Sequence, residues 1–351
     1  RRHRHHRHGL LELSRPKTEQ KKHRPSRPVF FHHVGTLAQI QQLDSDQPGL
    51  LHILCQGHAR MRIDRAHQLP HGLWVADVSL MNSLTLELGN RPDLITSVYD
   101  GTALIAAGNQ LLRYRADEPL AEITHDLPAS ETPGIIDLAL VPGFPADPEL
   151  YICYRTSTDI RVLPMTLDAT LTSAKAGPAL LTGLPLPVDP TDIGCQIGFG
   201  PDGLLYVGTS DGGDPNAPQS LTSAGGKILR LDPKTSAAPA DNPFADRSTD
   251  PITKIIYSYG HRAITGMAWH PVSHQLYAID RGPGREDEIN LIVSGGNYGW
   301  NPASRSQTSY RTDGVPMTDL AIGSARPAAY SSGDSSKRMG AATFVAGAQW
   351  G

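Results

Sequence analysis

The sequence predicts an all-β protein built from repeated antiparallel hairpins. Glycine (34 residues) and proline (29 residues) are abundant in the 351-residue chain, whereas charged residues make up 19% and aromatic residues 6%. This composition is typical of many short strands joined by tight turns, not of long helices. A strand, a proline-containing turn and a second strand centred on Leu-Tyr recur along the chain. Hairpins repeated at a regular period indicate a β-propeller.

Three copies of this hairpin are regular. They occupy residues 138–154, 197–208 and 267–279, so the period is roughly 60 to 70 residues, slightly more than a four-stranded blade requires. Residues 96–108 form a less regular copy around an Asp-Gly turn, which is the strongest short hairpin signal. A further copy begins at residue 341. We therefore expect four recognisable blades and the start of a fifth, with the propeller beginning near Gly72.

The chain before the propeller divides into two parts. Residues 1–29 are rich in Arg and His and poor in apolar residues, so we expect a disordered basic tail. Residues 30–71 carry no pattern that assigns a structure. Residues 72–351 are expected to form an incomplete propeller, because a ring that does not close leaves strand edges unpaired. We therefore expect the chain to be a piece of a longer product.

Charge, hydropathy and cysteine content restrict the partners. The formal net charge of −3 gives no general attraction to nucleic acid or to an anionic membrane. No apolar run reaches the roughly 18 residues that a membrane span requires, and no signal peptide is visible at the start. Cys55, Cys153 and Cys195 are odd in number and lack zinc-ligand spacing. We expect them to be buried small apolar side chains.

Five sequence blocks carry a family resemblance. They are Ile-Gly-Phe-Gly-Pro-Asp-Gly-Leu-Leu-Tyr-Val-Gly-Thr (197–209), Gly-Lys-Ile-Leu-Arg-Leu-Asp-Pro (226–233), Tyr-Gly-His-Arg (259–262), Arg-Gly-Pro-Gly-Arg-Glu-Asp-Glu-Ile-Asn (281–290) and Asn-Tyr-Gly-Trp (297–300). In order and spacing they resemble the soluble glucose/sorbosone dehydrogenases. The resemblance implies a six-bladed propeller, of which this chain holds about four to five blades.

The same resemblance implies the chemistry. Members of the family oxidise the CH–OH group of sugars or other alcohols with pyrroloquinoline quinone (PQQ) and calcium, and they pass the electrons to an external acceptor. It also implies a periplasmic or secreted location.

The Gly-Pro turn at residues 282–283 is the strongest local motif. A hard cation binds carbonyl and carboxylate oxygens, and such a turn presents consecutive carbonyls rigidly. The resemblance implies that Gly282 and Pro283 hold the calcium ion that also binds PQQ, and that Asp287 and Glu288 hold a structural calcium ion. The alternative is a solvated acidic turn.

Arg262 and two aromatic residues are the candidates for cofactor contacts. The arginine fork pairs with carboxylates and polarises a quinone oxygen, and the resemblance places Arg262 against PQQ. Where the family continues Arg-Asn, this chain has Ala263. The alternative for Arg262 is a surface salt bridge. Tyr298 and Trp300 either stack on the cofactor at the mouth of the propeller or belong to its core.

The family's catalytic histidine is missing. Oxidation of a hydroxyl needs a base, and an ungapped comparison places Asp192 at that position. An exposed carboxylate is a weaker base than histidine by about two pKa units, although burial would raise its pKa. A shift of one residue would place Ile193 there. Thr132 or Glu131 replaces a cofactor-binding Gln or Glu of the family.

Two functions therefore stay open. One is an active PQQ-dependent dehydrogenase with Asp192 as the base, and the other is a catalytically inactive propeller of the same family that binds carbohydrate or a protein partner. An unrelated propeller hydrolase would need a nucleophile or metal-ligand cluster, and the sequence offers none.

Overall fold

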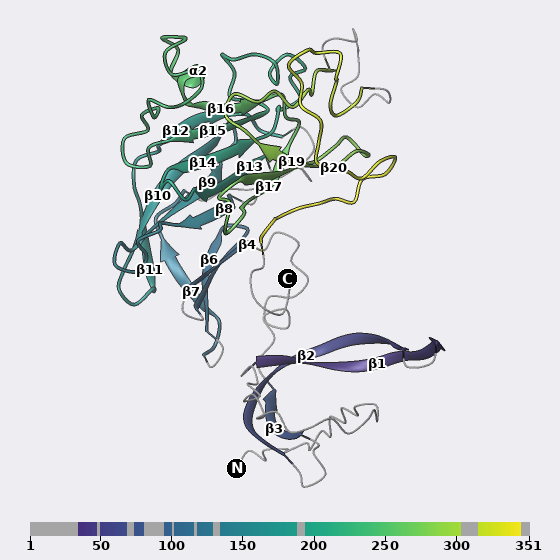
Figure 1. Ribbon diagram of the computed structural model, residues 1–351. Helices are drawn as coiled ribbons and strands as arrows, with labels where there is room; N and C mark the ends of the chain where they lie inside the picture. The colour runs from purple at the N-terminus through teal and green to yellow at the C-terminus, as the bar shows by residue number, and fades with distance from the viewer. Residues whose placement is uncertain are drawn as a thin grey trace. The chain divides into compact units, whose positions relative to one another are not determined.

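The protein is described by a computed structural model (Figure 1). It gives the backbone of four strands between residues 34 and 99, and side chains as well for residues 102–115, 118–128, 134–187, 194–302 and 315–344. The contacts divide the chain into two compact units, residues 1–91 with 115–120 and residues 92–114 with 121–351. The predicted basic tail, residues 1–29, lies outside the described residues.

The first unit contains one antiparallel sheet in the order β1-β2-β3. Its strands are β1 (Val34–Gln47), β2 (Leu50–Gln68) and β3 (Trp74–Leu80). The register of β1 and β2 runs from Val34 opposite Arg62 to Gln47 opposite Leu50. The long hairpin of β1 and β2 therefore lies within residues 30–71, for which the sequence predicted no structure.

The second unit begins with two groups of strands that share one sheet. The parallel pairing of β7 with β11 joins the two groups. The first group is β4 (Ile95–Tyr99), β5 (Thr102–Ala107), β6 (Gln110–Arg115) and β7 (Ala121–His125). The second group is β8 (Ile135–Leu140), β9 (Glu149–Arg155), β10 (Ile160–Leu167), β11 (Ser173–Ala176) and β12 (Leu181–Leu184).

Two four-stranded antiparallel sheets follow, each with its strands in chain order. The first consists of β13 (Cys195–Phe199), β14 (Leu205–Thr209), β15 (Lys227–Leu231) and β16 (Ile256–Tyr259). The second consists of β17 (Ile264–Trp269), β18 (Leu276–Asp280), β19 (Glu288–Ile292) and β20 (Tyr330–Ser331). A short helix, α2 (Pro251–Ile255), precedes β16 and is capped by the Asp250 carboxylate, which accepts from Thr253 N.

The predicted all-β fold is confirmed. The hairpins expected from the proline turns are β8–β9, β13–β14 and β17–β18, and the Asp-Gly hairpin is β4–β5. Successive antiparallel sheets of this kind are the blades of a propeller. The number of blades in the complete ring stays a prediction, and residues 341–344, where a further copy was expected to begin, carry no strand.

The middle strands of the sheets are buried on both faces. Every residue of β5, β14 and β15 is buried, and β14 and β15 are covered on both faces because their sheet has apolar contacts with two neighbouring groups of strands. One apolar cluster joins β8, β9 and β10 to the sheet β13–β16, and another joins that sheet to β17–β19. The loops at the ends of these strands are therefore attached to a packed core.

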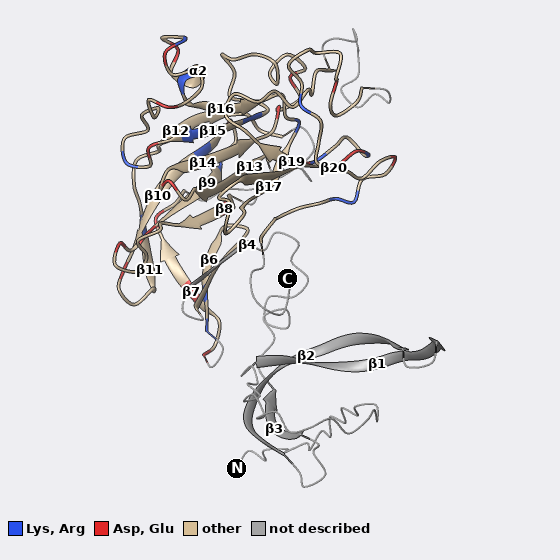
Figure 2. Ribbon diagram, viewed as in Figure 1, with Lys and Arg blue, Asp and Glu red and all other residues tan. Residues whose placement is uncertain are grey.

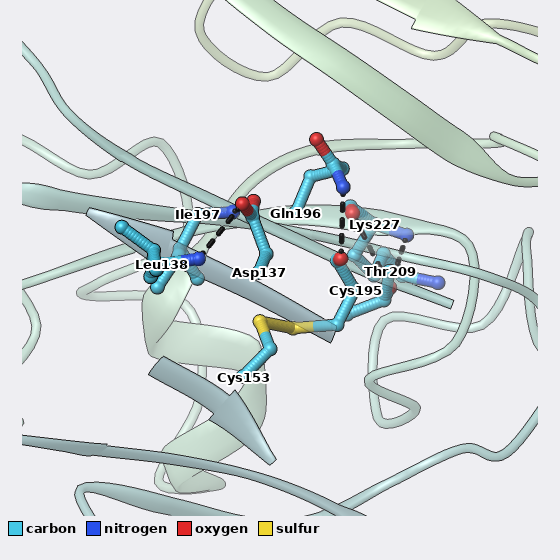
Figure 3. The surroundings of a disulfide bond; sticks show 8 residues. All are labelled: Asp137, Leu138, Cys153, Cys195, Gln196, Ile197, Thr209 and Lys227. Atoms are coloured by element: carbon cyan, nitrogen blue, oxygen red, sulfur yellow. Dashed lines mark hydrogen bonds between the residues drawn. A yellow bond between two sulfur atoms is a disulfide. The ribbon is translucent and has the colours of Figure 1, made fainter. Parts of the chain in front are cut away.

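The prediction for the cysteines is wrong for two of the three. Cys153 on β9 and Cys195 on β13 form a disulfide, with their Cα atoms 6.2 Å apart (Figure 3). No sequence pattern predicted this bond, because the two residues are 42 positions apart and are brought together by the packing of neighbouring sheets. A disulfide closing a loop of this length stabilises a fold by about 2–4 kcal/mol. Cys55 lies in β2, whose side chains are not described.

A buried carboxyl group joins the same two sheets beside the disulfide (Figure 3). Asp137 on β8 accepts hydrogen bonds from Leu138 N (2.8 Å) and from Ile197 N on β13 (2.7 Å). Burial raises the pKa of Asp137 to about 7, although both hydrogen bonds lower it. The carboxyl group thus provides an acceptor for an N–H group at the edge of β13 at the cost of desolvation.

Asp137 should make stability depend on pH. Its pKa in the folded state lies above the unfolded value of about 3.9, so the native protein retains a proton that the unfolded chain releases. The free energy of unfolding should therefore fall between about pH 4 and pH 7 by up to about 4 kcal/mol and then level off. Asp137→Asn should lack this component, as urea unfolding across that pH range measures. Equal pH dependence in both proteins would contradict the assignment.

Candidate cofactor and substrate site

The predicted site residues with a described position lie at one end of β14–β19, in the loops there or, for Glu288, at the first residue of β19. The loop after β14 bridges to the loop after β16 through Ser210 and Ala263, and Tyr259 bridges to Asn297. The third loop follows β18, whose last residue, Asp280, is opposite Ile264 in the register. Residues from distant blocks of the sequence thus meet at one end of the strands of the two sheets.

Arg262 is buried in this region, with 5% of its surface exposed. Its Nη1 atom donates to the carbonyl oxygens of Arg281 (2.8 Å) and Gly282 (3.2 Å). Its own carbonyl accepts from Asp211 N at 2.8 Å. A surface salt bridge, the alternative reading of this residue, is excluded because the side chain lies inside the protein. The guanidinium group is held against the Gly-Pro turn.

Asp280 orients the backbone at Arg262 and Ala263 through hydrogen bonds. Its carboxylate accepts from Arg262 N (3.1 Å) and Ala263 N (2.8 Å), and it lies 3.1 Å from His261 Nδ1. His261 Nε2 lies 2.9 Å from Ser258 Oγ. The order Ser-His-Asp resembles a hydrolase triad, but all three side chains are buried. A nucleophile must be accessible to substrate. We therefore interpret the hydrogen-bonded series Ser258–His261–Asp280 as a structural support for the loop.

Asp287 stabilises the Gly-Pro turn through hydrogen bonds. Its carboxylate accepts from Gly282 N (3.0 Å), Ser336 Oγ (2.8 Å) and Lys337 N (2.8 Å). A Cβ atom on Gly282 would overlap the carbonyl oxygen of Arg285, so the turn requires glycine at this position. The carboxylate thereby ties the turn to the segment after β20.

Glu288 is buried one residue further along. Its carboxyl group accepts from Thr318 Oγ1 (2.9 Å) and Asn290 Nδ2 (3.2 Å). Burial raises its pKa to about 8, with a smaller contribution from the nearby Asp280 charge. Glu288 therefore lies within the protein, in contrast to the solvated turn that was the alternative interpretation.

The arrangement of these residues does not fit a calcium ion. The carbonyl oxygen of Gly282 accepts from a guanidinium cation, and the Asp287 carboxylate already receives several donors. Among the described residues, no group of three or more His, Cys, Asp or Glu side chains could hold a metal. The roles of Gly282, Pro283, Asp287 and Glu288 as calcium ligands therefore stay predictions without support from this geometry.

Tyr298 and Trp300 are packed as core residues, the second of the two alternatives considered for them. Both are 1% exposed. The Tyr298 ring stacks on His261 with centroids 4.7 Å apart, and its hydroxyl donates to Leu291 O (2.6 Å). Trp300 Nε1 donates to Asp211 Oδ2 (2.7 Å). Neither ring is placed to stack on a flat cofactor, and both instead support the loops around them.

Basic and acidic residues both occur on the loops beside β19 and β20 (Figure 2), and five of the basic residues lie on the segments that meet at the Gly-Pro turn. Arg281 N donates to Ala263 O, and Lys337 N donates to Asp287, so the segments that carry these residues are adjacent. Lys337 and Arg338 are exposed. An anion with several carboxylates fits such a set of guanidinium and ammonium donors. The five residues, here called the basic cluster, are Arg262, Arg281, Arg285, Lys337 and Arg338.

Comparison with known proteins identifies the family. Residues 90–351 match Glucose / Sorbosone dehydrogenase. The chain belongs to this family. The resemblance seen in the sequence blocks is thereby confirmed over about three quarters of the chain.

Relatives of this glucose/sorbosone dehydrogenase chain include two curated proteins and a solved structure. A Synechocystis protein, slr1608, is 34% identical over 53% of the chain and 47% of its own length. The aldose sugar dehydrogenase YliI of Escherichia coli is 25% identical over 75% of the chain and 73% of its length. The PQQ-bound aldose sugar dehydrogenase of Streptomyces coelicolor is 25% identical, with a TM-score of 0.58 over 81% of this chain and 75% of that one. The chain thus spans about half the length of the Synechocystis relative.

Two predicted residues of the glucose/sorbosone dehydrogenase site, Asp192 and Thr132, lie outside the described residues, as do their alternatives, Ile193 and Glu131. Gly194 is described, and its carbonyl accepts from Ser210 N at 3.4 Å. The chain that follows Asp192 therefore meets the loop after β14.

A cavity formed by described residues lies elsewhere on the chain. It has a volume of about 590 Å³ and is lined by residues that include Tyr206, Trp269 and Leu276. Trp269 pairs with Leu276 at the end of β17 opposite to Ile264. The cavity thus lies at the far end of the strands from Arg262 and plays no part in the candidate site.

Proposed function

We propose that the chain is part of a PQQ-dependent oxidoreductase that oxidises the CH–OH group of sugars. Membership of the glucose/sorbosone dehydrogenase family supports oxidation of a sugar, and the relative with bound PQQ supports the cofactor. The observation in this chain that carries the proposal is the buried Arg262 in contact with the Gly-Pro turn, within the basic cluster.

The residues of the chain provide binding and orientation. PQQ, when bound, supplies an ortho-quinone that accepts a hydride. The basic cluster would pair with its carboxylates, and Arg262 would stabilise negative charge that develops on a quinone oxygen. Asp280 holds the backbone N–H groups of Arg262 and Ala263, so the guanidinium group does not need to be ordered when the cofactor binds. Such preorganisation is the main source of electrostatic catalysis.

A catalytically inactive member that binds carbohydrate or a protein partner is the second candidate. It is favoured by Ala263, which stands where the family has asparagine and offers no side-chain hydrogen bond to a cofactor. The backbone N–H of Ala263 is used by Asp280. Turnover by the PQQ-loaded protein separates the two candidates.

We further propose a periplasmic or secreted location and an external electron acceptor. The Cys153–Cys195 disulfide supports the location, because disulfides persist in oxidising compartments. In the described part of the chain, no helix is long and apolar enough to cross a membrane.

Ligand binding by the purified protein tests the cofactor assignment. PQQ should raise the melting temperature, since a ligand at 100 times its dissociation constant stabilises the native state by about 2.7 kcal/mol. Calcium alone should leave the melting temperature unchanged, because Gly282 O accepts from Arg262 and the cationic guanidinium repels a second cation there. Differential scanning fluorimetry with each ligand alone and with both measures this. A rise with calcium alone would contradict our description of the turn, and no rise with PQQ would contradict the cofactor.

A further inference from the structure

The cavity that includes Trp269 lies between the two four-stranded sheets, at the end of the strands opposite to the candidate site. Tyr206 of β14 and Tyr257 of β16 line it from one sheet, and Trp269 of β17 lines it from the other. Exposed residues of the turns, Asp202 and Ser294 among them, also line it, so it opens to solvent. Its volume of about 590 Å³ is within the roughly 300–1,000 Å³ of small-molecule sites. We call it the far-end cavity.

The aromatic rings of the far-end cavity are held in place by the protein itself. Tyr206 makes edge-to-face contacts with Trp269 and Tyr257, with ring centroids 5.3 and 5.4 Å apart. The Tyr206 hydroxyl donates to Asp202 Oδ2 at 2.9 Å. The indole of Trp269 reaches across to β13, where a Cβ atom on Gly198 would lie only 2.9 Å from Trp269 Cζ3. A ligand would therefore meet preorganised rings, which reduces the entropy lost on binding.

The charged groups beside the far-end cavity already pair with one another. Arg230 is 7% exposed, and its guanidinium carbon lies 6.0 and 5.7 Å from the centroids of the Tyr206 and Tyr257 rings. Arg230 Nε donates to Asp202 Oδ2 at 3.0 Å, and Arg230 Nη1 donates to Asp241 Oδ1 at 2.8 Å. The guanidinium group would repel a cationic ligand, and the two carboxylates would repel an anionic one. The cavity therefore favours a neutral ligand.

Polar groups of the lining favour a ligand that carries hydroxyl groups. In the described part of the chain, the hydroxyl groups of Tyr257 and Ser294 form no hydrogen bond, and the Gln275 side chain uses only its Oε1 atom, which accepts from Ser273 Oγ (3.2 Å). A wholly apolar ligand would desolvate these groups without pairing them, at a cost in free energy. A pyranose ring fits both surfaces, because the C–H groups of its faces pack on aromatic rings and its hydroxyl groups form hydrogen bonds at the edge.

We propose that the far-end cavity is a non-catalytic binding site for one neutral pyranose ring. The ring belongs either to a free sugar or to the end of a glycan, since both present the same faces and hydroxyl groups. This site is distinct from the proposed site of sugar oxidation, because the cavity and Arg262 lie at opposite ends of the strands. Binding there requires neither PQQ nor turnover.

Sugar binding by the protein without PQQ tests the proposal. D-glucose and maltotriose are titrated separately, and ligand-observed NMR measures the dissociation constant of each. We expect saturable binding of maltotriose. Binding of D-glucose as well would identify a free sugar as a ligand, whereas binding of maltotriose alone would identify the end of a glycan. Absence of saturable binding for both sugars, or tighter binding of tetramethylammonium than of either sugar, would overturn the proposal.

Substitutions in the lining locate the bound sugar. Trp269→Ala should raise the dissociation constant by at least about 10-fold, because the sugar loses an aromatic contact surface. Ser294→Trp should abolish binding by filling the cavity, and it replaces an exposed side chain, so it also serves if Trp269→Ala does not fold. Ser173→Trp, exposed on β11, is the matched control and should leave the dissociation constant unchanged.

Arg262→Ala distinguishes the far-end cavity from the candidate site. This variant should bind the sugar as the wild type does, since Arg262 lies at the other end of the strands. Unchanged binding by folded Ser294→Trp, or loss of binding in Arg262→Ala but not in Ser294→Trp, would place the sugar elsewhere and overturn the proposal.

Discussion

Arg262→Ala is expected to lower kcat/KM for aldose oxidation by the PQQ-loaded protein by about 10²- to 10³-fold. The guanidinium group is buried and fixed against the Arg281 and Gly282 carbonyls, and removing one preorganised donor from a developing oxyanion has an effect of this size. Arg262→Lys should recover only part of the loss, because an ammonium group lacks the planar fork. Steady-state rates at saturating acceptor measure both variants.

Arg247→Ala is the control for the loss of an arginine. Arg247 is exposed and lies over the Phe244 ring, away from the site, so its removal should leave kcat/KM unchanged. If Arg262→Ala retained full activity, the role of Arg262 in catalysis would be wrong. If its melting temperature alone fell, the residue would be structural.

Asp280→Ala is expected to cause the largest loss of stability, about 3–5 kcal/mol. The substitution leaves the N–H groups of Arg262 and Ala263 and the Nδ1 atom of His261 without their buried acceptor. Breaking a buried charged network by removing one partner has this magnitude. Urea unfolding of both proteins at pH 7 measures the difference.

Asp246→Ala provides the matched control for this variant. Asp246 is exposed, and a surface substitution of this kind should change the free energy of unfolding by no more than about 0.5 kcal/mol. A similarly small effect of Asp280→Ala would show that the hydrogen bonds of Asp280 around Arg262 contribute little to the free energy of unfolding. The order of the site loops would then need another explanation.

Local patterns in the sequence predicted the hairpins well. The proline turns and the Asp-Gly turn fix chain reversal within a few residues, and the structure places strands on both sides of each. The sheet of residues 34–80 was not predicted, because β1 and β2 are long strands without a regular alternation of apolar residues. Where turn chemistry and alternation agree, a strand is predictable, and where alternation is missing it is not.

Contacts between sheets could not be predicted in the same way. The Cys153–Cys195 disulfide and the hydrogen bond of Trp300 to Asp211 join residues 42 and 89 positions apart. Such pairs depend on how one sheet packs on the next, and a single sequence carries no period that reports this packing. The family resemblance placed both Arg262 and Gly282 at the cofactor. The structure brings them into contact, because Arg262 lies just before β17 and Gly282 just after β18, at the same end of that hairpin. The buried positions of Tyr298 and Trp300 required the structure.

Reduction of bound PQQ by a sugar tests the central claim most directly. The protein is loaded with one equivalent of PQQ, and D-glucose or another aldose is added without oxygen or any electron acceptor while the absorption spectrum of the quinone is followed. Oxidation of the CH–OH group predicts conversion of the bound quinone to the quinol in proportion to the protein, slowed in Arg262→Ala. A quinone that stays bound and oxidised at saturating aldose would contradict the account and leave a propeller that only binds.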